Sequence, residues 1–85
     1  MSDVDATLAE RGKRYGDFTT HAMISQQILD RIKTYDGWQR LDATKREAMT
    51  LIVHKIARIL NGDPEYRDNW HDIAGYAMLA EERCS

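Results

Sequence analysis

One stretch of the chain, residues 51–76, constrains most of what the rest can fold into. It reads LIVHKIARILNGDPEYRDNWHDIAGY, with apolar residues at helical spacing on both sides of the turn-forming run NGDP at 61–64. We therefore predict a helical hairpin. Its first helix should run from about 42–44 to 60, and its second from about 68 to 82.

Each helix of this hairpin carries a narrow polar stripe on an otherwise apolar surface. The stripe residues are Thr50, His54, Lys55 and Arg58 on the first helix and Asp68, Asn69 and Asp72 on the second. Charges on largely buried helices are costly unless they are paired or used. The stripes therefore predict either a salt-bridge network, such as Arg58 with Asp72, or a pocket for a phosphorylated ligand. The two readings are compatible, because an aspartate can orient an arginine that binds phosphate.

Helical spacing extends over most of the chain, and the alternation typical of strands is absent. It predicts further helices over about 3–11 and 18–35, with Trp38 in the following loop packing on the core. Apolar residues surround almost the whole helix that ends at Leu60, so that helix should be central. A chain of 85 residues buries little surface, so homo-oligomerisation should complete its burial. The expected fold is all-α: one domain over 1–85, a small bundle of about four helices around the hairpin.

Composition and charge exclude several classes of partner. The net charge of −2 offers no overall attraction to nucleic acid, and the candidate helix-turn-helix turn is acidic, so nucleic-acid binding is not expected. No apolar run reaches membrane-spanning length, so no membrane partner is expected. The acidic start, MSDVDATLAE, does not resemble a signal peptide, and the single cysteine, Cys84, cannot form an internal disulfide. We expect a cytoplasmic protein.

The connector RGKRYGDF is a candidate phosphate contact. It places Arg11, Lys13 and Arg14 between two glycines and beside Tyr15. A solvated basic turn, held to the core by its aromatic residues, is an equally good interpretation.

No catalytic residue, metal or cofactor is predicted from motifs. The three histidines are scattered without ligand spacing, and no nucleophile motif or glycine-rich phosphate loop is present. Asp68 and Asp72 alone would hold Mg²⁺ only with help from ligand phosphates.

Three segments, ERGKRYGDF, HKIARILNGDP and DNWHDIAGYA, resemble a family of small phage and prophage proteins of unassigned function. That family resembles, more distantly, the MazG-like all-α nucleotide pyrophosphohydrolases, in which an E-E-x-x-E helix and an E-x-x-D helix bind Mg²⁺. Where the first motif would fall, this chain has HKIAR, and where the second would fall it has NWHD. Only Asp72 corresponds. Lys55 and Arg58 should repel Mg²⁺ and could instead contact phosphate directly.

The resemblance thus implies a non-catalytic, oligomeric nucleotide-binding protein that acts as a sponge, sequestering nucleotide-derived immune signals of the phage's host. Its expected ligand-binding residues are basic, acidic and aromatic: Arg11, Lys13, Arg14, Tyr15, His54, Lys55, Arg58, Asp68, Trp70, Asp72 and Tyr76. Two alternatives stay open. One is a divergent pyrophosphohydrolase that uses Asp68, Asp72 and either Glu47 or Glu65. The other is a helical interaction module that inhibits a host protein.

Overall fold

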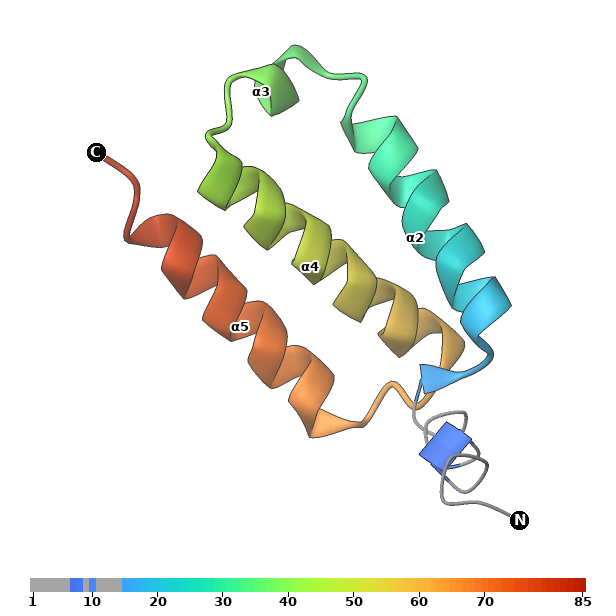
Figure 1. Cartoon of the computed structure of the whole chain (residues 1–85). Coiled ribbons are helices and arrows are strands. Elements are labelled where there is room, and N and C mark those ends of the chain that lie inside the picture. The colour runs from blue at the N-terminus through green and yellow to red at the C-terminus, as the bar shows by residue number, and fades with distance from the viewer. Residues whose placement is uncertain (1–6, 9, 11–14) are drawn as a thin grey trace.

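The computed structural model describes residues 7, 8, 10 and 15–85, and within them it contains helices and no strand. The four helices that can be bounded are α2 (Phe18–Ile32), α3 (Asp36–Gln39), α4 (Ala43–Asn61) and α5 (Arg67–Glu81). α4 lies between α2 and α5 and packs on both (Figure 1). The all-α fold class and the central hairpin, formed by α4 and α5, are therefore confirmed. Most of the helix expected over 3–11 lies outside the described residues.

α2 begins at Phe18 because Asp17 caps it. The Asp17 carboxylate accepts hydrogen bonds from the backbone nitrogen of Thr20, at 2.9 Å, and from its hydroxyl, at 2.7 Å. These bonds lower the pKa of Asp17. α2 ends at Ile32, three residues before the predicted end, in a turn where the Thr34 hydroxyl donates to the carbonyl of Arg31.

The segment predicted as a loop contains the single-turn helix α3, and the predicted anchor Trp38 is buried on it. Two cations lie over its ring, with Lys33 Nζ 5.7 Å and the Arg46 guanidinium carbon 6.0 Å from the ring centroid. Arg46 also donates to the backbone oxygens of Trp38 and Gln39. The side chain of Arg46 thereby fixes α3 against α4.

The ends of the α4–α5 hairpin follow local capping chemistry. α4 starts after Asp42, whose carboxylate accepts from the backbone nitrogen of Lys45 at 2.8 Å. α5 starts at Arg67, one residue earlier than predicted. Asp68 is not its cap, because the Asp68 carboxylate accepts a hydrogen bond from the Tyr66 hydroxyl instead.

The core is small and centred on α4. Its buried apolar residues are Leu29, Trp38, Ala48, Val53 and Ala57, three of them on α4. Other apolar residues of α4 remain open, with Leu60 67% exposed. α4 is therefore central, as predicted, but a single chain does not cover it completely. No helix in the described part of the chain is long and apolar enough to cross a membrane.

Candidate functional site

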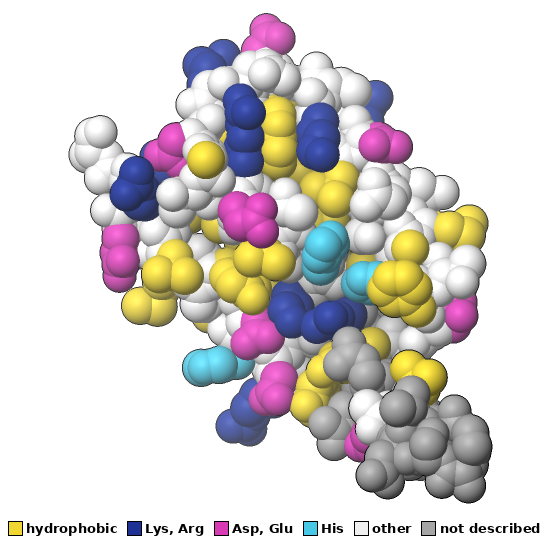
Figure 2. Space-filling model, viewed as in Figure 1, with side chains coloured by type: hydrophobic (Ala, Val, Ile, Leu, Met, Phe, Trp, Pro, Cys, Tyr) yellow, Lys and Arg dark blue, Asp and Glu magenta, His cyan; other side chains and the backbone are white. Residues whose placement is uncertain are grey.

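The basic stripe of α4 meets the first turn of α2. The rings of His21, on α2, and His54, on α4, contact each other edge to face with 5.9 Å between centroids. Figure 2 shows histidine and basic side chains adjacent to one another on this face. No local spacing in the sequence pairs His21 with another histidine, and the fold supplies this partner.

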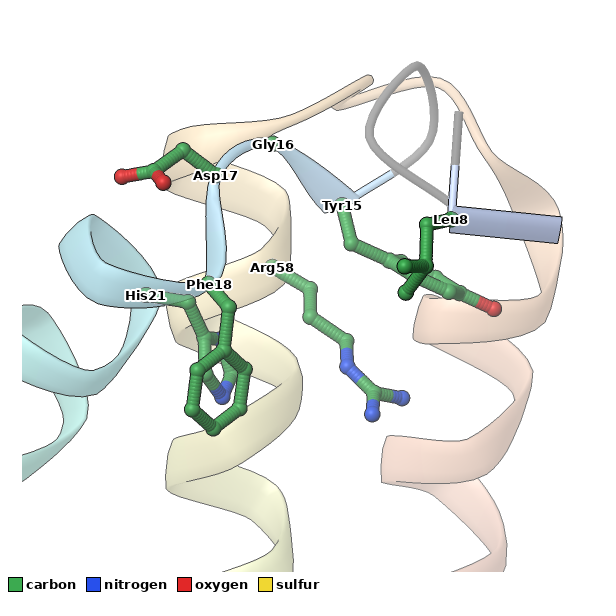
Figure 3. A pocket seen from close by; sticks show the side chains of 7 residues that line it. All are labelled: Leu8, Tyr15, Gly16, Asp17, Phe18, His21 and Arg58. Atoms are coloured by element: carbon green, nitrogen blue, oxygen red, sulfur yellow. The ribbon is translucent and has the colours of Figure 1, made fainter. Parts of the chain in front are cut away.

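Arg58 lines a pocket at this junction. The pocket has a volume of about 350 Å³ and its lining residues are Leu8, Tyr15, Gly16, Asp17, Phe18, His21 and Arg58. The guanidinium carbon of Arg58 lies 4.5 Å from the centroid of the Tyr15 ring. Figure 3 shows the Arg58 side chain extending between Phe18 and Tyr15, while the Asp17 carboxylate points away. A cation with aromatic walls on both sides therefore faces the open space.

Asn61 and Gly16 position the segment that forms one wall of this pocket. The Asn61 side-chain amide donates to the backbone oxygens of Tyr15, at 3.3 Å, and Asp17, at 2.8 Å. Gly16 has φ +79°, and a Cβ at this position would overlap the backbone oxygen of Asn61. The sequence suggested Asn61 only as a helix end, because its long-range contacts have no local signal.

Asp72 forms an ion pair with Lys55 rather than with Arg58. The Lys55 Nζ lies 3.0 Å from Asp72 Oδ2. Among the described residues Arg58 forms no salt bridge, and its guanidinium lies over the Tyr15 ring instead. The hairpin does bring the basic and acidic stripes together, but it leaves Arg58 available to a ligand.

The surroundings of His21 favour its neutral form. Burial lowers the pKa of His21, and the positive charges of Arg58, His54 and Lys55 lower it further. Its Nδ1 is buried and has no hydrogen-bond partner in the described part of the chain. An anion bound beside Arg58 would relieve the repulsion by adding negative charge.

Asn69, like His21, has a buried polar atom. The sequence placed Asn69 in the polar stripe of the second hairpin helix but not among the expected ligand-binding residues. It is 1% exposed, lies one turn before Asp72 on α5, and its Nδ2 has no hydrogen-bond partner among described residues. Its burial follows from the rotation of α5 on α4, which the sequence stripe alone does not fix.

The remaining predicted site residues do not gather at this pocket. Asp68 bonds Tyr66, and Trp70 is 55% exposed and donates from Nε1 to the carbonyl of Pro64 at 2.8 Å. Tyr76 lines shallower pockets farther along α5. The other three predicted contacts fall outside the described residues: Arg11, Lys13 and Arg14.

The described residues include no group of three His, Cys, Asp or Glu side chains placed to hold a metal ion. The carboxylates required by the pyrophosphohydrolase alternative are thus not assembled in this part of the chain. Asp72, one of the carboxylates that this alternative needs, is paired with Lys55.

Comparison with protein families gives one clear result. The model of the family described as Domain of unknown function (DUF6378) matches residues 3–84. The comparison with curated proteins gave no match, and neither did the comparison with solved structures. Because the match spans nearly the whole sequence, the chain belongs to the DUF6378 family.

Proposed function

We propose that this chain is a non-catalytic protein that binds a nucleotide-type phosphorylated small molecule in the pocket beside Arg58. One observation carries the proposal. Arg58 lines an open pocket with Tyr15 and Phe18, and it forms no salt bridge with any described carboxylate.

The chemistry of the lining residues suits such a ligand. A guanidinium donates paired hydrogen bonds to phosphate oxygens. His54 lies next to it on α4 with a ring that can donate a hydrogen bond, while Lys55 is held close by in its ion pair with Asp72. Phe18, which is 78% exposed, and Tyr15 offer ring faces to a base. The volume of about 350 Å³ lies within the usual range for small-molecule sites.

Binding without turnover is supported by the charges around the hairpin. The resemblance to MazG-like enzymes places basic residues, Lys55 and Arg58, where a metal-dependent relative has carboxylates. We propose that the hairpin is a former metal site that now contacts phosphate with side chains. A protein that binds a nucleotide-derived signal and leaves it intact would act by sequestering it, as the proposed relationship to phage proteins implies.

The test is a thermal-melting screen with AMP, ADP, ATP, a cyclic dinucleotide and inorganic phosphate, with and without Mg²⁺. A ligand at about 100 times its Kd adds about 2.7 kcal/mol of stability. For a chain of this size, each kcal/mol raises Tm by about 4–8 °C. The bound ligand is then released by denaturation and identified by chromatography.

Arg58→Gln should weaken the binding of the nucleotide that raises Tm by about 10- to 100-fold, since a charged hydrogen bond is lost. Arg31→Gln is a matched control, because Arg31 also lies over a tyrosine ring, that of Tyr35, but is exposed on α2. Its affinity should match that of the parent chain.

Two results would overturn the proposal. Recovery of a hydrolysed nucleotide, formed only when Mg²⁺ is present, would support the pyrophosphohydrolase alternative. A Tm unchanged by every nucleotide would instead support the interaction-module alternative.

A further inference from the structure

The side of α5 that faces away from α4 is exposed and has a regular pattern. We call it the α5 outer face, and its residues, spaced by three and four along the helix, are Arg67, Trp70, His71, Ala74, Ala77, Met78 and Glu81. In Figure 1, α4 lies along one side of α5 and no other labelled helix lies along the opposite side. We infer that a second copy of this chain docks here, its α5 antiparallel to the first about a two-fold axis through Ala74.

The charges at the two ends of this face select the antiparallel arrangement. Ala74 is the middle residue of α5, with Arg67 seven positions before it and Glu81 seven positions after it. A two-fold axis at Ala74 therefore brings Arg67 to the partner's Glu81, and the same pair forms twice. A parallel arrangement would instead place like charges opposite each other, which is unfavourable.

The middle of the face permits close approach of two helices. Ala74 is small, and a Cβ added at Gly75 would meet nothing within 4 Å. Glycine inside a helix costs about 1 kcal/mol relative to alanine, so a packing reason is expected at Gly75. No helix in the described part of the chain provides one, whereas a second α5 crossing at Ala74 would.

The same two-fold axis also brings together the large apolar residues that lie between the centre and the ends of the face. Trp70 lies four positions before Ala74 and Met78 four after it, so Trp70 meets the partner's Met78. Both are exposed, 55% and 61%. The hydrogen bond from Trp70 Nε1 to Pro64 already holds the indole ring in place, which lowers the entropy cost of burying it.

A shallow groove on α5 of each copy can receive the Trp70 indole of the other copy. It has a volume of about 410 Å³ and its lining residues are His71, Asp72, Gly75, Tyr76, Met78, Leu79 and Glu82. A tryptophan that fills a pocket on its partner is a typical hot spot of an interface.

The first test is the solution mass of the full chain by sedimentation equilibrium from micromolar to millimolar concentration. We expect twice the chain mass of 9.8 kDa, with a concentration-dependent return to monomer. Ala74→Glu should raise the dimer Kd at least 100-fold, because it buries two like charges at the axis. Met23→Glu adds the same charge at an exposed apolar residue of α2 and should leave the Kd unchanged.

Charge exchange tests the direction of pairing. Arg67→Glu and Glu81→Arg should each weaken the dimer, and the double variant should restore it. The two residues are fourteen positions apart, about 21 Å along the helix, so restoration cannot come from within one chain. In a parallel dimer, charge exchange would leave like charges opposite each other, so the double variant would dimerise no more tightly than the parent chain.

Disulfide trapping tests whether the two-fold axis passes through Ala74. With Cys84→Ser as background, mild oxidation of Ala74→Cys should link two chains, whereas Met78→Cys should not, since the axis keeps the two copies of residue 78 apart. A monomeric mass at every concentration, or a dimer unaffected by both Ala74→Glu and charge exchange, would overturn the inference.

Discussion

The Nζ of Lys55 lies 3.0 Å from a carboxylate oxygen of Asp72 and joins the two helices of the hairpin. Lys55 is the more covered partner, with a side chain 12% exposed against 41% for Asp72. Because the carboxylate is used in this pair, Arg58 packs on Tyr15 and remains in the open pocket. The ion pair therefore gives the two cations different roles: Lys55 joins the helices, and Arg58 can contact a ligand.

Asp72→Asn should lower the free energy of unfolding by about 1 kcal/mol, measured by urea denaturation. The value is modest because one partner is nearly half exposed, although Lys55 is left unpaired in a covered position. Asp30→Asn, exposed on α2, is the control and should change stability by less than about 0.5 kcal/mol.

The same variant separates the functional hypotheses. Removing the negative charge of Asp72 beside the basic cluster should leave nucleotide affinity unchanged or raise it. The pyrophosphohydrolase alternative requires the opposite, a complete loss of metal-dependent turnover. Isothermal titration with the nucleotide that raises Tm, together with product analysis, decides between them.

Gly16→Ala should destabilise the fold by at least about 2 kcal/mol and disrupt the pocket. The residue has φ +79°, which is strained for alanine, and its Cβ would overlap the backbone of Asn61. Gly37→Ala is the control, since its Cβ would meet only the flexible Arg40 side chain, at 3.7 Å. A Gly16→Ala variant as stable as the Gly37→Ala variant would contradict the described position of the Tyr15–Asp17 segment.

The hairpin could be predicted from the sequence because its signals are local. Apolar spacing marks both helices, and the NGDP run marks the turn between them. The choice of Lys55 over Arg58 as the partner of Asp72 could not be predicted. It depends on the rotation of α4 about its own axis when it packs on α5, and the two cations are less than one turn apart.

The pocket was only partly predictable, for a different reason. Arg58 and Tyr15 were both named from the sequence, but the contact between them depends on Asn61, which is hydrogen-bonded to residues more than forty positions away. His21 and Phe18 join the pocket because the Asp17 cap fixes where α2 begins. The helix over Asp36–Gln39 was missed because Asp36-Gly37 is a turn signal, whereas burial of Trp38 stabilises a helical turn.

The pKa of His21 should lie below 6.5 in the free protein, measured by NMR titration of its ring protons. Burial and the nearby cations disfavour its charged form. Inorganic phosphate or a bound nucleotide should raise this pKa, because an anion next to the imidazole favours the charged form. A free-protein pKa above 6.5, or no change with a saturating nucleotide, would contradict the described cluster.

This shift also gives a direction to the pH dependence of stability. Since the folded-state pKa is lower than the unfolded value, the unfolded chain binds more protons as the pH falls below about 6.5. The contribution of His21 is therefore fully present above pH 6.5 and is lost as the pH falls through the folded-state pKa. His21→Gln should make the free energy of unfolding less sensitive to pH between 7 and 5.

Trp38→Ala should cost about 3–5 kcal/mol, the usual loss for a buried tryptophan. Lys33 and Arg46 lie over the ring, and Arg46 also donates to the backbone of α3, so removal of the ring loosens the whole connection between α2 and α4. Urea denaturation followed by circular dichroism measures the loss. Tyr35→Ala is the control, because Tyr35 is 56% exposed although Arg31 lies over its ring, and it should cost less than about 1 kcal/mol. Equal losses for the two variants would show that Trp38 does not contribute to stability as a core residue.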